Sequence, residues 1–163
     1  MERRLAVLLM FAVVPGGELA AQQTAETTFR VQARVEAVCS IIAANLDFGT
    51  YTAQGSVPVL GTTLLRATCS PNQNYQIGLN EGTSPGATVN QRKMMSGVTY
   101  TLNYQLYSDS ARSVIWGNTQ NTDTVTGVGT GLAQDHTVYG TIPPAQQVPA
   151  EEYADTITVR IYY

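Results

Sequence analysis

The chain has 163 residues, a formal net charge of −3 at pH 7 and only 13% charged residues. Its length corresponds to a single domain, and without a basic patch or stripe it does not match a nucleic-acid-binding protein. One histidine and two cysteines are too few ligands for a zinc or copper site, so we expect neither a metal nor another cofactor.

Residues 1–21 have the pattern of a secretory signal peptide. Two arginines precede an apolar run at 5–14, Pro15-Gly16-Gly17 breaks this run, and Leu19-Ala20-Ala21 is a suitable cleavage site. A membrane anchor would need about 20 apolar residues, which is twice what this run offers. We therefore expect export, a mature chain that begins at Gln22, and no membrane span after cleavage.

The segment Phe29–Ala37 alternates between apolar and polar residues. This period of two places Phe29, Val31, Ala33 and Val35 on one face of a predicted strand. Two interpretations stay open. The segment can be the first strand of the domain itself, or a spare strand that completes another sheet. It can also serve partly as one and partly as the other.

Cys39 and Cys69 are predicted to form a disulfide, because an exported chain enters an oxidising compartment. The closed loop would have about 31 residues, for which the chain-entropy relation gives roughly 3.5–4 kcal/mol of stabilisation. The alternative is a pair of unrelated buried thiols.

The middle of the chain predicts further short strands. Apolar residues alternate at 75–79 and 100–106, short strand candidates lie at 64–69 and 137–142, and a strand stub lies at 46–49. Turn-forming clusters rich in Pro, Gly and Asn separate them, and no stretch of about ten residues has apolar residues at helical spacing. The glycine-rich segment 118–135 is predicted to be a loop or a poorly covered edge. We therefore expect an all-β sandwich of the immunoglobulin-like class.

The segment Asp155–Tyr163 is predicted to be a half-buried strand with nothing after it to cover its edge. One face of this strand would hold four residues, namely Ile157, Val159, Ile161 and Tyr163. Tyr153 stands just before it, where immunoglobulin-like sandwiches have a tyrosine whose hydroxyl bonds the backbone at a corner.

The sequence gives little support to catalysis. His136 follows Asp135 but has no nucleophile at a familiar spacing, and the carboxylates of Glu151 and Glu152 fit a solvated turn. The glycines at 127–131 are not followed by the Lys-Ser/Thr of a phosphate-binding loop. Trp116 and the tyrosines could form a sugar-binding platform, but packing inside the sandwich is the better interpretation. We expect no catalytic residues.

Several motifs occur in an order that resembles the spore coat protein U domain family, the subunits of archaic chaperone–usher pili, over residues 29–163. The motifs are Cys39, Leu46-Asp-Phe-Gly49-Thr-Tyr51, Cys69, 104–112 with Trp116-Gly117, Val138-Tyr-Gly-Thr-Ile-Pro143, and Tyr153-Ala-Asp155 before the final strand. In one departure, Glu151 stands where similar proteins often have glycine.

The resemblance implies a non-enzymatic pilus subunit with an immunoglobulin-like sandwich that lacks its final strand. A partner strand would complete it, with 22–37 as the donor segment and 38–163 as the domain. Phe29, Val31, Ala33 and Val35 would be inserted, and Ile157, Val159, Ile161 and Tyr163 would line the acceptor groove and contact the chaperone.

The implied partners are a periplasmic chaperone, an outer-membrane usher and neighbouring subunits. The implied route runs from the periplasm to the cell surface, and the implied roles are adhesion and biofilm formation. The alternatives are a secreted coat protein or a carbohydrate-binding adhesin module, whereas a small secreted enzyme is disfavoured.

Overall fold

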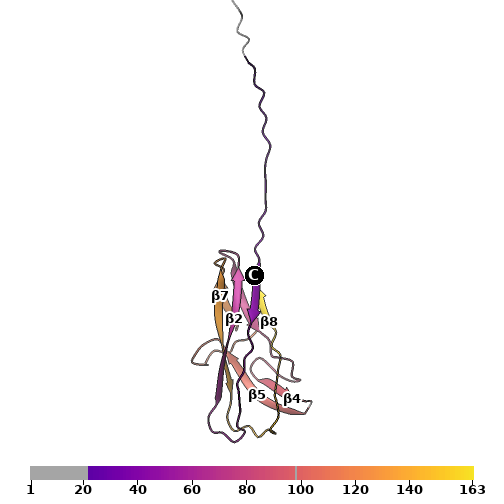
Figure 1. Ribbon diagram of the computed structural model, residues 1–163, viewed down its shortest axis with the longest axis vertical. Coiled ribbons are helices and arrows are strands. Elements are labelled where there is room, and N and C mark those ends of the chain that lie inside the picture. Colours follow the sequence, from indigo (N-terminus) through magenta and orange to yellow (C-terminus); the bar gives the residue numbers. More distant parts are fainter. Residues whose placement is uncertain (1–21, 98) are drawn as a thin grey trace, which may run out of the picture. The chain divides into compact units, whose positions relative to one another are not determined.

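A computed structural model describes residues 22–97 and 99–163 (Figure 1). The predicted signal peptide at 1–21 lies outside the described residues. The chain divides between Arg34 and Val35 into two units. In the first unit, residues 22–34 form neither helix nor strand, and the side chains of Phe29 and Val31 are 87% and 80% exposed.

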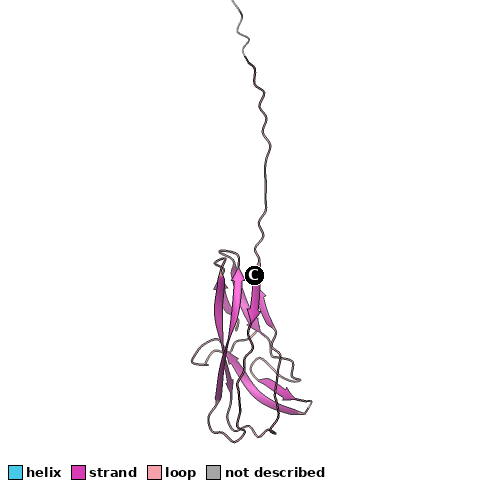
Figure 2. Ribbon diagram, viewed as in Figure 1, coloured by secondary structure: helices cyan, strands magenta, loops and turns pink. Residues whose placement is uncertain are grey.

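Within the described residues, the second unit consists of strands and loops (Figure 2). The strands are β1 (Cys39–Ala43), β2 (Val59–Cys69), β3 (Asn74–Leu79), β4 (Arg92–Ser96), β5 (Tyr100–Tyr107), β6 (Val125–Val128), β7 (Ala133–Ile142) and β8 (Val159–Tyr162). The described residues include no helix with the length and apolar character needed to cross a membrane.

The strands form two antiparallel sheets. One sheet has the order β1-β2-β7-β5-β4 and the other has the order β6-β3-β8. Their inward residues meet in one buried cluster, which includes Leu65 and Val138 of the first sheet and Ile77 and Leu79 of the second. The predicted all-β sandwich is therefore confirmed.

Several predicted element boundaries were wrong. Two strands begin earlier than predicted, β2 at Val59 and β7 at Ala133. The stub at 46–49 is not a strand, and β4 was not predicted. The segment 118–135, predicted to be a loop or a poorly covered edge, contains the edge strand β6. The last strand is also shorter than predicted, because its ladder with β3 begins only at Val159.

A fully buried arginine joins the two sheets at one end of the core. Arg92 has no exposed surface, and each of its five N–H donors makes a hydrogen bond. The acceptors are the carbonyl oxygens of Leu79, Asn80, Val89 and Trp116 and the side-chain oxygen of Gln105, at 2.7–3.2 Å. Burial lowers the pKa of this guanidinium.

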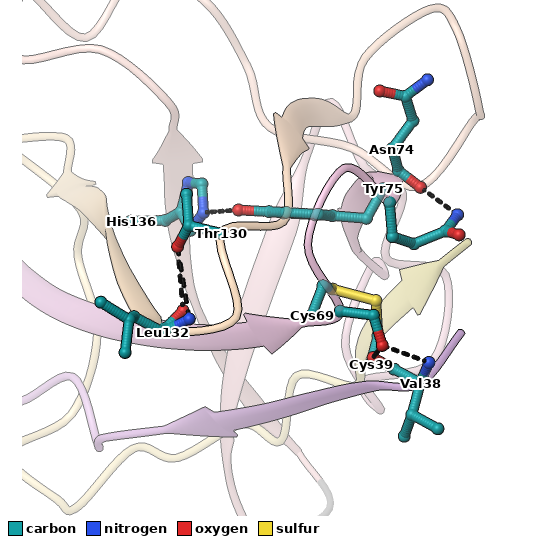
Figure 3. Close-up of a disulfide and its surroundings, with 10 residues drawn as sticks. Val38, Cys39, Cys69, Asn74, Tyr75, Thr130, Leu132 and His136 are labelled. Atoms are coloured by element: carbon teal, nitrogen blue, oxygen red, sulfur yellow. Dashed lines mark hydrogen bonds between the residues drawn. A yellow bond between two sulfur atoms is a disulfide. The ribbon is translucent and has the colours of Figure 1, made fainter. Parts of the chain in front are cut away.

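The predicted disulfide is confirmed, since Cys39 and Cys69 are joined in the structure (Figure 3). The two residues are direct partners in the β1–β2 ladder. Just before the disulfide, the Val38 amide donates to the Ser70 hydroxyl at 3.0 Å, and the Ser70 amide donates to the Val38 carbonyl at 2.9 Å. Val38 is therefore tied to Ser70 directly beside the disulfide.

Candidate strand-acceptor groove

Two strand edges border an opening between the sheets. β8 pairs with β3 along one side, where Ile77 lies opposite Ile161, and within the described chain no strand pairs with its other side. β1 is likewise at the edge of its sheet, since its described pairing is with β2 alone. The strands β1 and β8 contact each other, at the same end of the sandwich (Figure 1). Each edge offers unpaired backbone groups to an added strand.

A groove of about 600 Å³ opens between residues 43–48 and residues 153–159. Its floor consists of core side chains from both sheets, namely Leu65, Leu79, Tyr104, Leu106 and Val138. The hydrophobic core is therefore accessible along this opening.

The structure places the four predicted acceptor residues in three different surroundings. Ile157 and Val159 line the groove. Ile161 packs against the core and also lines a separate hollow, which Tyr163 shares. Tyr163 is 60% exposed. All four side chains of the predicted donor face, Phe29, Val31, Ala33 and Val35, are exposed.

The wall of the groove formed by residues 44–48 lies over two glycines that were not predicted to belong to the site. Gly61 of β2 and Gly140 of β7 are direct ladder partners. A Cβ atom at Gly140 would lie 2.6 Å from Cζ of Phe48, and one at Gly61 would lie 3.1 Å from Cδ1 of Leu46. Phe48 also meets Tyr104 edge-on, with 6.2 Å between the ring centroids. Glycine inside an alternating strand is a signal of such close approach.

A polar network crosses one end of the groove. The Tyr104 hydroxyl donates to Asp155 at 2.7 Å, and the same carboxylate accepts bonds from the amide and hydroxyl of Thr83 at 2.8 and 2.9 Å. Gly82, at φ 94°, approaches this carboxylate so closely that a side chain there would overlap it. Burial and the bond to Asp155 raise the pKa of Tyr104, so its hydroxyl remains a donor.

The segment before β8 is fixed from two sides. The Tyr153 hydroxyl donates to the Pro149 carbonyl at 3.2 Å, four residues upstream. Ala154 and Met95 exchange both backbone hydrogen bonds, at 2.9 and 3.0 Å. These contacts hold residues 153–154, on the side of the groove opposite residues 43–48, against β4.

Charged and titratable groups elsewhere form local pairs. The Tyr75 hydroxyl and Nε2 of His136 share a hydrogen bond of 2.9 Å (Figure 3), and burial lowers the pKa of His136. Asp135 accepts a 2.6 Å bond from Arg66, which lowers the pKa of Asp135. Among the residues that the structure describes, no three His, Cys, Asp or Glu side chains are grouped for metal binding. The arrangement of the groove suits the binding of an extended strand.

The spore coat protein U domain matches residues 25–160. The chain is similar to Protein U of Myxococcus xanthus, with 35% identity over 86% of each chain. It is also similar to a chain in the pre-assembly complex of a chaperone and a tip adhesion subunit from the archaic chaperone–usher Csu pili of Acinetobacter baumannii, with 28% identity and a TM-score of 0.53. That match covers 79% of this chain but only 40% of the solved chain. The chain thus belongs to the spore coat protein U domain family.

Proposed function

We propose that this chain is an exported structural subunit of a chaperone–usher pilus, which polymerises by donor-strand exchange. The observation that carries the proposal is the groove beside β8, where an edge strand borders an opening floored by core side chains. An extended segment that adds to this edge would form main-chain hydrogen bonds and fill the groove with alternate side chains.

The segment 22–37 has the pattern required of the donor. Burial of Phe29, Val31 and Val35, at about 1.5–3 kcal/mol each, would contribute about 5–9 kcal/mol, and Ala33 would add a smaller amount. Backbone pairing would mainly remove the cost of unpaired groups. A slip of one residue would bury Arg30, Gln32 and Arg34 instead, so the pattern also fixes the register.

The exposed edges imply protective partners. An open apolar groove with unpaired backbone groups is an aggregation hazard, so we propose a periplasmic chaperone that occupies it before an outer-membrane usher passes the subunit to a neighbour. The similarity to a chain in a chaperone–adhesion subunit complex supports this partner. The subunit would move from the periplasm to the cell surface and support adhesion and biofilm formation. Within it, 1–21 would act as the signal, 22–37 as the donor and 38–163 as the acceptor domain.

A spore or cell coat is the second candidate, and the family description favours it. Donor-strand exchange would link the subunits in either assembly. Electron microscopy of the assembled product separates the two, since a pilus gives thin fibres and a coat gives a surface layer.

The test compares chain 22–163 with a truncated chain 38–163, each produced in the periplasm with a candidate chaperone and usher. We expect the truncated chain to bind the chaperone but not to join the groove of the subunit ahead, as measured by polymers that resist unheated SDS gels. Val31→Arg should also block polymerisation, because it places a charge on the inserted face. Gln32→Arg, on the opposite face, is the matched control and should polymerise. Normal polymerisation of the truncated chain would refute donor-strand exchange.

A further inference from the structure

The outer face of the three-stranded sheet has a row of polar side chains. Gln76 of β3 lies directly opposite Thr126 of β6 on one side and Tyr162 of β8 on the other. Directly opposed residues of neighbouring strands share a face. The residues before and after Gln76, Tyr75 and Ile77, are buried in the core, so the row faces away from it.

The loop 118–124 is attached to this row and forms a wall beside it. Gln76 exchanges two hydrogen bonds with Asn121, at 2.7 and 2.9 Å, and accepts a third from the Thr124 hydroxyl at 2.7 Å. The Tyr162 hydroxyl donates to the side chain of Asn118 at 2.9 Å. These bonds fix the loop against the sheet and hold the position of Gln120, whose side chain is exposed.

The sheet and the loop border an open hollow of about 890 Å³. This volume lies within the range of about 300–1,000 Å³ that is usual for small-molecule sites. Its lining includes the amide side chains of Asn74, Gln76 and Gln120 and the rings of Tyr162 and Tyr163. None of the side chains that line it in the described chain is charged. The lining side chains are thus uncharged, and they combine amides and tyrosine rings with the apolar side chains of Val128 and Ile161.

We propose that this hollow binds a neutral oligosaccharide. An ionic ligand would lose hydration here without gaining a side-chain charge of opposite sign, and a wholly apolar ligand would leave the amides unpaired. Sugar hydroxyls donate and accept hydrogen bonds, as the amides of Asn74 and Gln120 do. The ring of Tyr163, 60% exposed, offers an apolar face for the C–H groups of a sugar and a hydroxyl at its rim.

The site differs from the aromatic platform that the sequence suggested. Trp116 is buried, and its indole N–H donates to the Ile77 carbonyl at 2.8 Å, so it is not available to a ligand. The hollow is lined by three consecutive residues at the end of β8, Ile161, Tyr162 and Tyr163, whereas Ile157 and Val159 line the acceptor groove. The groove and the hollow share no lining residue, although Ile161 and Tyr163 of the hollow are also predicted acceptor residues.

The test applies the mature chain, residues 22–163, to an array that holds neutral oligosaccharides, acidic oligosaccharides and uncharged extended peptides. Binding is then measured by titration calorimetry. We expect binding to neutral oligosaccharides only, and about tenfold weaker binding, equivalent to about 1.4 kcal/mol, for Tyr163→Ala and for Gln120→Ala. The matched controls are Tyr100→Ala and Gln54→Ala, which change exposed residues outside the hollow and should bind as the wild type does.

Three outcomes would overturn the proposal. They are no binding of any neutral oligosaccharide at millimolar concentration, equal binding by the two site variants and the wild type, or preferential binding of the acidic oligosaccharides or the peptides. Melting temperatures equal to that of the wild type would show that the site variants remain folded. Polymerisation of Gln120→Ala, followed in parallel, keeps a failure of this site distinct from a failure of donor-strand exchange, because Gln120 is not among the predicted acceptor residues.

Discussion

Gly61 and Gly140 face each other across β2 and β7, and the side chains of Leu46 and Phe48 lie over them. Without these glycines, two Cβ atoms would stand between the sheet and the segment 44–48. The segment can therefore lie close to the sheet, where it forms one wall of the acceptor groove. The absence of side chains at these two positions thus determines where this wall of the groove lies.

A methyl group at Gly140 should destabilise the domain. In Gly140→Ala the new Cβ would lie 2.6 Å from the ring of Phe48, and the ring would have to move. We expect a loss of about 1–3 kcal/mol in the free energy of unfolding, measured in urea. Gly61→Ala is the graded control, because its Cβ would lie 3.1 Å from its nearest neighbours and should cost less. Equal stability of Gly140→Ala and the wild type would contradict this account of the wall.

Replacement of Arg92 should cost far more than replacement of its neighbour. Arg92→Ala would remove the side-chain donor from the buried carbonyls of Leu79 and Trp116 and from the half-buried carbonyl of Asn80. Val89 and Gln105 would each lose one of two donors. Since one unpaired buried group costs about 1–3 kcal/mol, we expect at least about 3 kcal/mol of destabilisation in denaturant unfolding. Lys93→Ala, at a half-buried position on the same strand, should change stability by less than about 0.5 kcal/mol. Similar losses in both variants would show that the network is unimportant.

His136 should make stability depend on pH below about 6.5, the ordinary pKa of histidine. Burial lowers the pKa of this side chain, so the unfolded chain binds a proton at a higher pH than the folded domain. The contribution of His136 to the free energy of unfolding should therefore fall as the pH falls from 7 to 5, and then level once the folded domain is also protonated at His136. His136→Gln should remove this slope, measured by urea unfolding across the pH range. If the slope persists in the variant, groups other than His136 cause the pH dependence.

Removal of the Tyr104 hydroxyl should weaken the end of the groove. Tyr104→Phe keeps the ring that packs against Phe48 but removes the donor to Asp155. Because Thr83 still donates twice to this carboxylate, we expect a modest loss of about 1 kcal/mol in stability. Tyr100→Phe, at an exposed position, is the control for loss of a phenol hydroxyl. Calorimetry of the unfolding of both variants measures this loss of stability. Equal stability of Tyr104→Phe and the wild type would contradict the prediction.

The sequence predicted strands well where alternation is regular. β3 and β5 were found because each places apolar residues at every second position and polar ones between them. β4 was not predicted because its two buried residues, Arg92 and Ser96, are polar, and the acceptors of Arg92 come from distant parts of the chain. β6 was not recognised as a strand because Gly127 is typical of a loop, whereas in the structure it packs against the ring of Tyr75.

The candidate site was predictable in part for a similar reason. Ile157 and Val159 follow from local alternation, and both line the groove. The opposite wall depends on Leu46 and Phe48 meeting glycines that lie far along the chain. Long-range contacts of this kind leave no periodic signal in either segment.

The attachment of Val38 beside the disulfide has a mechanical consequence. In a fibre linked as proposed, tension would reach each domain through the segment that precedes Val38 and would act on the Val38–Ser70 hydrogen bonds and the Cys39–Cys69 bond. The covalent bond would pass the load directly to the long strand β2, so the short strand β1 could not be peeled away first. The fibre would then be strongest where the pulled strand enters the domain.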